Sequence, residues 1–439
     1  MIKENTPDKE KENTETITNK KPGDKNKKEE ILQAQVTIGT IGHVDNGKST
    51  LVQALTGKFP DDHSEELKRG ISIRLGYADT DFRKCAVCNE SYTVEKVCPE
   101  CKNPTKVLRR ISFVDCPGHE VLMATLLSGV TLMDGAILLI AANSRCPQPQ
   151  TREHLAAMEI LGISNIVIAQ NKIELASEEE AERNYNEIKA FVKGTIAENA
   201  PIIPISAMHK ANLDLLIEAI EKHIPTPDLE EGQPLEMYVA RSFDINKPGT
   251  EPSKLKGGVL GGSIKSGQVK VGDEIEILPG LSLKKDNKTI YSPIQTKVVS
   301  VSIGKQGLVP QARSGGLVAI GTELDPSFVK SDKMAGNIIS SPGMGSPIRS
   351  SLTLEVQLLE YVVGSEEITK VQPLAKNEML MLNAGTARTS GVITEIKGTI
   401  AHIKLSRNIV ARINSTVAIS RRISQRFRLI GVGKIVDDK

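Results

Sequence analysis

The 439-residue chain has little aromatic character and no long apolar run. It contains no tryptophan, and only 3% of its residues are aromatic, so base stacking is not expected to dominate any contact with nucleic acid. No stretch approaches the roughly 20 apolar residues of a membrane-spanning helix, and no signal-peptide pattern opens the chain. We therefore expect a soluble, cytoplasmic protein, and the length suggests two to four domains.

Apolar residues are also scarce near the N-terminus. The first 30 residues carry 8 Lys, 6 Glu and 2 Asp, and their only sizeable apolar residues are Met1, Ile2 and Ile17. Such a segment cannot bury enough surface to offset its ordering entropy. We interpret residues 1–34 as a disordered charged tail.

Acidic residues are missing from one C-terminal segment. The formal net charge of the chain is +2, but residues 396–436 contain nine Lys or Arg residues and no Asp or Glu. An excess of one sign attracts polyanions, although a solvated protein surface would also explain it. The candidates for anion binding in this segment are Arg407, Arg412, Arg421, Arg422, Arg426 and Arg428.

Residues 35–227 alternate strand-like apolar runs with helical patterns. Strands are expected at residues 36–42, 111–118, 135–143, 165–172 and 201–207, and a helix at 178–198. This alternation predicts an α/β domain with a mostly parallel sheet and helices on both faces. Ligands of such sheets bind at the carboxyl ends of the strands.

Three prolines and an acidic run at residues 224–234 end this pattern. The following chain consists of short β-type runs separated by Gly, Pro and Asn, which is typical of small antiparallel barrels. We interpret the Gly- and Pro-containing stretch 340–347 as a linker. One β-barrel domain is expected at residues 228–345 and a second at 346–439.

The motif GHVDNGKST at residues 42–50 matches the phosphate-binding pattern G-x-x-x-x-G-K-S between a strand and a helix. Gly42 and Gly47 allow backbone N–H groups to turn toward phosphates. Lys48 would reach the β- and γ-phosphate oxygens, and Ser49 would offer its hydroxyl to Mg²⁺. The candidate nucleotide-binding residues of the loop are Asp45, Asn46, Gly47, Lys48, Ser49 and Thr50.

A second phosphate motif, DCPGHE at residues 115–120, follows another expected strand. Asp115 would hold Mg²⁺ through a water molecule, and the Gly118 N–H would sense the γ-phosphate. His119 is placed to orient the attacking water, although a histidine alone here could be a surface-loop residue. RGISI at residues 69–73 supplies a further Mg²⁺ ligand, the Ser72 hydroxyl.

Asp45 would lie beside the triphosphate, where its carboxylate is repelled unless a cation bridges the two. It could bind a second Mg²⁺ together with the backbone carbonyl of Gly70, or help to polarise the attacking water. The side chain could equally point to solvent. Asp45 and His119 are therefore the two catalytic candidates.

QNKIEL at residues 170–175 resembles the guanine-reading loop N-K-x-D, with Glu174 in place of the aspartate. Guanine presents two donors, N1–H and the 2-amino group, to an acceptor-only carboxylate, whereas adenine presents an acceptor there. A carboxylate left facing adenine would cost about 1–3 kcal/mol or more, so we expect GTP to be preferred over ATP. The residues expected around the base are Asn171, Lys172, Glu174, Ser206, Ala207 and Met208.

Four of the six cysteines form two knuckles, Cys85 with Cys88 and Cys98 with Cys101. Four thiolates at this spacing are typical of a tetrahedral Zn²⁺ site with a structural role. Disulfides are the alternative, but thiols stay reduced in a cytoplasmic protein. The two remaining cysteines, 116 and 146, are interpreted as core or loop residues.

The motifs GHVDNGKS, RGISI, DCPGHE, NKIE and SAM (206–208), in this order and followed by two β-barrels, resemble a translational GTPase of the elongation factor Tu type. The cysteine knuckles between the switch motifs, with HSEELKRGISIRLGYAD (63–79) and VARSFDINKPGT (239–250), resemble the gamma-subunit family of archaeal and eukaryotic translation initiation factor 2. The resemblance covers the chain after residue 34. The compact chain favours an archaeal member.

The resemblance implies a subunit that binds GTP and joins alpha and beta subunits in a heterotrimer. It also implies delivery of methionylated initiator tRNA to the small ribosomal subunit and hydrolysis of GTP as start-codon selection completes. The tRNA backbone would be the partner of the basic segment 396–436. The phosphate, magnesium and water roles would fall to Lys48, Ser49, Ser72, Asp115, Gly118 and His119.

Two positions depart from the family pattern, besides the glutamate of the base loop. Asn46 replaces a usual histidine and is expected at the flank of the phosphate loop. Ser72 replaces a usual threonine, and loss of the methyl group would loosen the closed switch. Two other functions stay open: an elongator- or selenocysteine-type tRNA carrier, and a GTP-gated scaffold with negligible hydrolysis of its own.

Overall fold

The computed structural model describes residues 33–60, 75–88, 91–119, 122–228, 232–285, 288–304, 307–363, 369–423 and 426–437. The tail expected at residues 1–34 lies outside this part of the chain except for its last two residues. The Gln33 amide donates to the carbonyls of Arg313 (2.5 Å) and Gly315 (2.7 Å), and Ala34 is buried.

The N-terminal sheet has seven strands in the order β3-β2-β4-β1-β5-β6-β7. Their bounds are β1 (Val36–Gly42), β2 (Gly76–Cys85), β3 (Tyr92–Thr93), β4 (Thr105–Asp115), β5 (Gly135–Ala141), β6 (Ile166–Asn171) and β7 (Ile202–Pro204). The five strands from β4 to β7 pair in parallel, whereas β2 pairs antiparallel with β4 and β3. The predicted mostly parallel sheet is confirmed.

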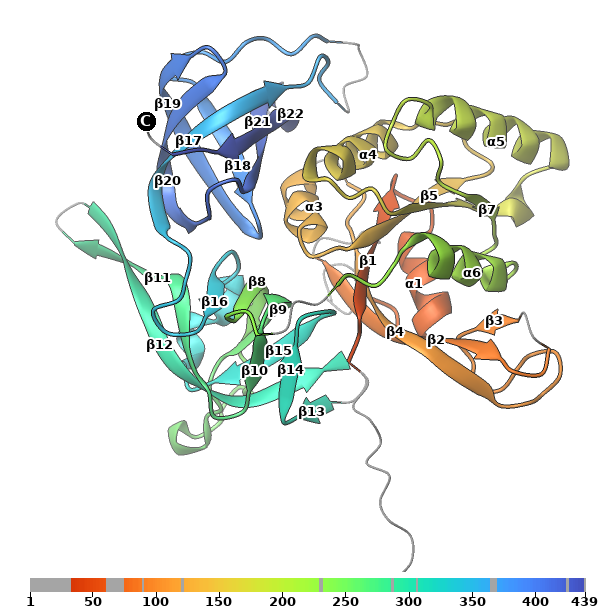
Figure 1. The fold of residues 1–439 in the computed structure, drawn as a ribbon, viewed down its shortest axis with the longest axis horizontal. Coiled ribbons are helices and arrows are strands. Elements are labelled where there is room, and N and C mark those ends of the chain that lie inside the picture. The colour runs from red at the N-terminus through yellow and green to blue at the C-terminus, as the bar shows by residue number, and fades with distance from the viewer. Residues whose placement is uncertain are drawn as a thin grey trace, which may run out of the picture. The chain divides into compact units, whose positions relative to one another are not determined.

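Helices cover both faces of this sheet, as predicted (Figure 1). Two hydrophobic cores lie between the helices and the sheet. One contains residues of α3, α4 and α5, and the other contains residues of α1 and α6. The helices are α1 (Lys48–Thr56), α3 (Met123–Val130), α4 (Pro149–Leu161), α5 (Glu178–Val192) and α6 (Leu213–His223), with the 3₁₀ turn η2 (Ile173–Leu175). A capping box between Ser177 and Glu180 begins α5, which ends six residues before the expected boundary at 198.

Three of the sequence motifs follow strands that are close in the sheet order. β1 ends at Gly42, β4 at Asp115 and β6 at Asn171, and only β5 separates β1 from β6. Parallel strands present their carboxyl ends at one edge of the sheet. The sheet therefore brings the phosphate loop, the second phosphate motif and the base loop to the same edge.

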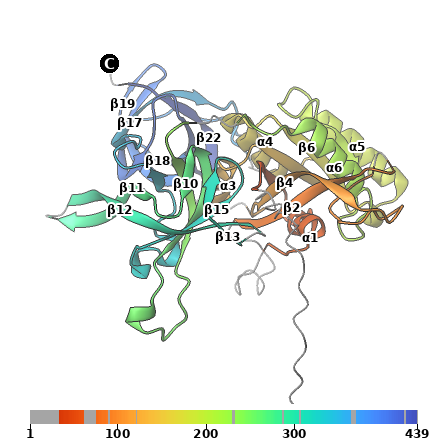
Figure 2. The ribbon, with the colours of Figure 1, turned by 60° about the horizontal axis from the view of Figure 1, so that its bottom comes forward.

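The first barrel closes through the pairing of β11 with β12, and its strands follow the order β11-β16-β8-β9-β15-β12. These six strands are β8 (Glu236–Phe243), β9 (Val259–Ser266), β11 (Glu274–Lys285), β12 (Lys288–Ile303), β15 (Val318–Thr322) and β16 (Ile338–Ser340). β13 (Gly307–Val309) pairs with β12, and β10 (Gln268–Lys270) and β14 (Gln311–Arg313) pair with each other. The 3₁₀ turns of this region are η3 (Pro252–Lys254), η5 (Pro326–Phe328) and η6 (Lys330–Asp332). Figure 2 shows β11 and β12 as a long two-stranded ribbon.

The second barrel is a closed ring of six antiparallel strands in the order β17-β20-β19-β18-β21-β22. Its strands are β17 (Ile348–Leu358), β18 (Met379–Ala384), β19 (Ala387–Lys397), β20 (Ile400–Val410), β21 (Thr416–Ile423) and β22 (Arg426–Ile435). Residues 341–347 connect it to β16. The predicted fold class, an α/β domain followed by two antiparallel barrels, is confirmed. Among the described residues, no helix is long and apolar enough to cross a membrane.

Candidate functional site

The phosphate loop joins β1 to α1 through backbone conformations that favour glycine. Gly42 has φ +135°, and Gly47 caps α1 with φ +89°. A Cβ atom on Gly42 would lie 2.3 Å from the Leu139 carbonyl oxygen, so the close approach of β1 and β5 requires glycine here. Lys48 is buried, and its ammonium donates to the carbonyls of Gly42 (3.2 Å) and His43 (2.8 Å).

Asp115 lies fully buried at the end of β4, directly opposite the phosphate loop. Its two carboxylate oxygens accept from the hydroxyls of Ser49 (2.5 Å) and Thr40 (2.5 Å). Ser49 and Asp115 are the two expected magnesium ligands of these loops, and the structure brings them together. Thr40 was not predicted.

The next turn of the chain lies against the phosphate loop. A Cβ atom on Gly118 would be 2.5 Å from the Lys48 Nζ and 2.9 Å from the Val44 backbone nitrogen, so only glycine permits this approach. His119 follows, and its Nδ1 is buried without a hydrogen-bond partner among the described residues. The expected water-orienting residue is therefore beside the phosphate loop.

Two further histidines surround Lys48. The His154 Nδ1 accepts from the Gly42 N–H at 2.8 Å. Burial first, and then the charges of Lys48 and His43, hold the pKa of His154 well below its usual value. Burial and the charge of Lys48 also lower the pKa of His43. The lowered pKa values favour the neutral form of both imidazoles near Lys48.

Asn46 and Asn171 tie the phosphate loop to the base loop. The Asn46 side chain is buried and donates to the Leu139 carbonyl at 2.9 Å. The structure thus places the Asn46 side chain against β5. The Asn171 amide donates to the Asn46 carbonyl (2.8 Å) and accepts from the Ala207 N–H (3.0 Å).

The other residues expected around the base differ in burial. Ser206 is buried and accepts from the His209 N–H at 3.1 Å. Lys172 has a left-handed backbone (φ 62°) and leads into η2, where Glu174 is exposed. Met208 is 69% exposed. The structure therefore gathers Asn171, Ser206 and Ala207 around one point and leaves Glu174 and Met208 open to solvent.

Of the four remaining expected residues, the structure describes Asp45 and Thr50. Asp45 is exposed with φ 63°, and Thr50 lies half-buried in α1. Gly70 and Ser72 lie outside the described residues.

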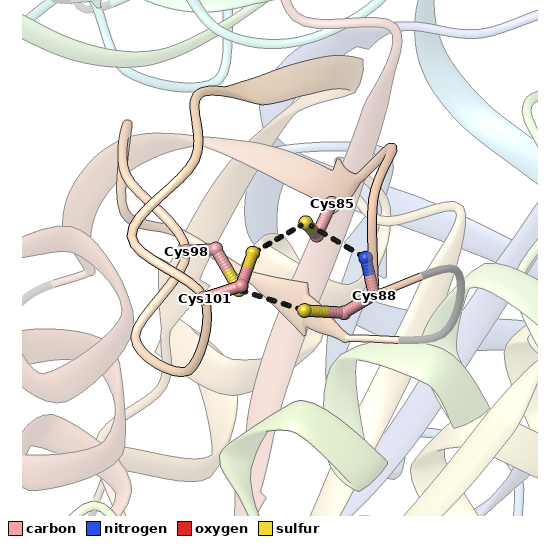
Figure 3. Close-up of side chains that lie close together, drawn as sticks. All are labelled: Cys85, Cys88, Cys98 and Cys101. Carbon is pink, nitrogen blue, oxygen red and sulfur yellow. Dashed lines mark hydrogen bonds between the residues drawn. The ribbon is translucent and has the colours of Figure 1, made fainter.

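The four knuckle cysteines converge between β2, β3 and the start of β4 (Figure 3). The Sγ atoms of Cys85 and Cys101 are 3.5 Å apart and those of Cys88 and Cys98 are 3.9 Å apart, and all four Sγ atoms lie within 4.8 Å of one another. A tetrahedral ion with metal–sulfur distances of about 2.3 Å separates its sulfurs by about 3.8 Å. The donor set fits such an ion, and none of the four is in a disulfide.

Backbone and side-chain donors surround these sulfurs. The N–H groups of Val87 and Cys88 donate to the Cys85 Sγ, each at 3.4 Å. Hydrogen bonds from Cys88 and then Asn103 lower the pKa of Cys101 to about 6. Outside the cluster, burial is the main cause that raises the pKa of Cys116, and it raises the pKa of Cys146 to about 12.

Within the part of the chain that the structure describes, three candidate RNA-binding arginines form ion pairs with acids outside the basic segment. Arg412 pairs with Glu236, Arg421 with Glu378 and Arg428 with Glu153. The side chains of Arg421 and Arg428 are only 14% and 12% exposed. Arg422 and Arg426 are exposed and Arg407 is half-buried. The basic segment contains no acidic residue, but the fold brings glutamates from other parts of the chain into contact with its arginines.

His154 and Thr40 are the residues of this site that the sequence analysis missed. No sequence signal marked His154, because α4 also buries the apolar residues Leu155 and Met158, and the burial of His154 is seen only in the structure.

Comparison with known proteins identifies the family. The family model described as the elongation factor Tu GTP binding domain matches residues 33–226, and that of the C-terminal part of initiation factor eIF2 gamma matches residues 350–435. The translation initiation factor 2 subunit gamma of Methanocaldococcus jannaschii is 58% identical over 93% of this chain and 99% of its own length. That of Archaeoglobus fulgidus is 56% identical over 92% of this chain and 95% of its own length.

Solved structures share the fold at lower identity. A bacterial selenocysteine-specific elongation factor superposes with TM-score 0.71 at 25% identity, over 92% of this chain and 59% of its own. The elongation factor SelB of Methanococcus maripaludis gives TM-score 0.68 at 22% identity, over 93% of this chain and 80% of its own. The higher identity and fuller coverage lie with the initiation factors. The chain therefore belongs to the gamma-subunit family of translation initiation factor 2, whose members are translational GTPases.

Proposed function

We propose that this chain, when it holds GTP, binds methionylated initiator tRNA and delivers it to the small ribosomal subunit together with alpha and beta subunits. GTP hydrolysis on start-codon selection would then end the delivery. The observation that carries this proposal is the meeting of Lys48, Ser49 and Asp115 at one sheet edge, in a chain 58% identical to an initiation factor 2 gamma subunit. Work on the ribosome would place the protein in the cytoplasm.

The nucleotide site is proposed to use the loops already described. Lys48 would leave the carbonyls of its own loop for the β- and γ-phosphates, and Gly118 would move with it, because a γ-phosphate needs the space between them. Ser49 would bind Mg²⁺ directly and Asp115 through water, and the ion would neutralise charge on the phosphates. His119 would orient the attacking water. Ser72, Gly70 and Asp45 stay proposed magnesium ligands.

Base recognition is proposed to rest on Asn171, Lys172 and Glu174, with Ser206, Ala207 and Met208 at the base edge. The hydrogen bonds of Asn171 to both the phosphate loop and Ala207 support this role, since they fix the two loops together. The carboxylate of Glu174 would accept from the two guanine donors.

The four knuckle cysteines are proposed to hold a structural Zn²⁺. The sulfur spacing and the N–H donors around the Cys85 Sγ support this, because thiolates in structural zinc sites require such donors and a closed set of four ligands. The knuckles at residues 85–101 would be an insertion in a GTP-binding domain of residues 35–227, which is followed by domains at 228–345 and 346–439.

RNA contact by the second barrel is proposed to rest chiefly on the exposed side chains of Arg422 and Arg426 and on the half-buried Arg407. Arg421 and Arg428 would first have to break nearly buried ion pairs, which is costly. Arg412 is paired but its side chain is 61% exposed, so it could bridge its partner and a phosphate.

Single-turnover GTP hydrolysis separates this function from that of a scaffold with negligible activity. With small ribosomal subunits, initiator tRNA and the other subunits present, we expect His119→Ala to slow hydrolysis about 10²- to 10⁴-fold, the usual contribution of a positioned proton-transfer or water-orienting group. His223→Ala, which changes an exposed histidine on α6, is the matched control. Equal rates for His119→Ala and the wild type would refute the catalytic assignment.

A further inference from the structure

Helix α4 connects the second barrel to the phosphate loop through two consecutive side chains. Glu153 is buried and pairs with Arg428 of β22. The next residue, His154, is also buried and accepts from the Gly42 N–H at 2.8 Å. Consecutive helical residues point about 100° apart, so the same turn of α4 reaches the barrel with one side chain and the phosphate loop with the other.

His154 completes the hydrogen bonding of Gly42. The Gly42 N–H donates to the imidazole of His154, and the Gly42 carbonyl accepts from the Lys48 ammonium at 3.2 Å. The left-handed φ of Gly42 and its tight approach to Leu139 leave this residue little freedom to find another acceptor. A buried N–H without an acceptor destabilises the conformation that leaves it so. The loop conformation therefore depends on an unprotonated Nδ1 at His154.

We propose that His154 is a positioning residue for the phosphate loop, and that the Glu153–Arg428 ion pair lets the second barrel set the rate of nucleotide release through α4. Movement of β22 that pulls Arg428 away would leave Glu153 buried without its partner and shift α4. His154 would move with the helix and release the Gly42 N–H. This inference rests on the proposed role of residues 42–50 as the phosphate loop.

Release of a fluorescent GDP analogue from the full chain, followed by stopped flow, tests the role of His154. Asn and Leu are similar in size, but the Asn carbonyl oxygen lies three bonds from Cα, as Nδ1 does, and can accept from Gly42. We expect His154→Leu to speed release tenfold or more and His154→Asn less than threefold. Equal release from the two variants would overturn the inference. Failure of the wild type to bind GDP would instead refute the proposed nucleotide site.

A second comparison tests the link to the barrel. Glu221 pairs with Arg109 in a similarly buried ion pair on α6, so Glu221→Gln is the matched control for Glu153→Gln. We expect Glu153→Gln and Arg428→Met to speed GDP release at least threefold, and Glu221→Gln less than 1.5-fold. When His154→Leu is already present, adding Glu153→Gln should increase the rate of GDP release by less than 1.5-fold. Equal effects of the two Gln variants, or full additivity with His154→Leu, would overturn the link.

Discussion

Substitution of Glu174 tests whether its carboxylate recognises guanine. Glu174 is exposed in η2, two residues after Lys172. Glu174→Gln replaces one acceptor oxygen with an amide donor, which would face a guanine donor. We expect this variant to lose about 1–3 kcal/mol of its preference for GTP over ATP, measured by competition of ATP against a fluorescent GTP analogue. Glu179→Gln, on the exposed first turn of α5, is the control, and an unchanged preference in Glu174→Gln would contradict the assignment.

A pH dependence follows from the neutral state of His154. Its pKa in the folded protein lies well below 6.5, whereas in the unfolded chain it returns to that value. Below about pH 6.5 the unfolded chain therefore binds one more proton than the folded chain. The free energy of unfolding then decreases as the pH decreases, by up to about 1.4 kcal/mol per pH unit. We expect the Tm of the wild type to fall more between pH 7.5 and 5.5 than that of His154→Asn, which cannot titrate. Any contribution of His43 is common to both proteins, so equal falls would show that His154 is not held neutral.

The placement of residues around the phosphate loop was largely predictable, because each residue lies in a contiguous motif at a strand end. The placement of Lys48, Ser49, Asp115 and Gly118 beside one another follows from the strand ends. The burial of Asn46 and the role of His154 did not follow. Both depend on a neighbour distant in sequence, namely Leu139 for Asn46 and Gly42 for His154.

The antiparallel strands β2 and β4, with β3 between them in sequence, carry the cysteine cluster. β2 ends at Cys85, and its register pairs Cys85 with Thr105, just beyond the second knuckle. Pairing of these strands brings Cys85 and Cys88 to Cys98 and Cys101, so the strands and an ion would each stabilise the other.

Metal content tests the cysteine cluster. We expect about one zinc ion per chain by elemental analysis after purification in zinc-containing buffer. Cys101→Ser should lose most of it, because three remaining thiolates bind zinc more weakly than four. Cys146→Ser removes a cysteine outside the cluster and should keep the ion. Zinc absent from the wild type, or lost equally from both variants, would refute a zinc site built from the four knuckle cysteines.

At the scale of elements, the sequence predicted the parallel strands better than the antiparallel strand β2. Buried parallel strands such as β5 are continuous apolar runs and are easily seen. β2 was not predicted, although Ala78, Thr80 and Phe82 alternate as a half-buried strand does. The residues between them include Asp79 and Asp81, which accept from Ser112 and Arg110 of β4. These partners make acidic residues acceptable in a strand, and the sequence alone does not identify them.

The whole molecule shows why a charge count along the chain can mislead. The basic segment has no acid of its own, yet three of its arginines meet Glu236, Glu378 and Glu153, all far away in sequence. The fold class and the order of its parts were predictable from motif order and strand spacing. The ion pairs between distant elements were not, because they depend on the tertiary fold.

Binding of methionylated initiator tRNA is the measurement that tests the proposed function most directly. The factor assembled with its alpha and beta subunits would be titrated by filter binding with initiator tRNA and with methionylated elongator tRNA, each with a non-hydrolysable GTP analogue and with GDP. We predict that initiator tRNA binds at least tenfold more tightly than elongator tRNA, and more tightly with the GTP analogue than with GDP. Equal affinity for the two tRNAs, or no difference between the two nucleotides, would contradict a GTP-dependent carrier of initiator tRNA.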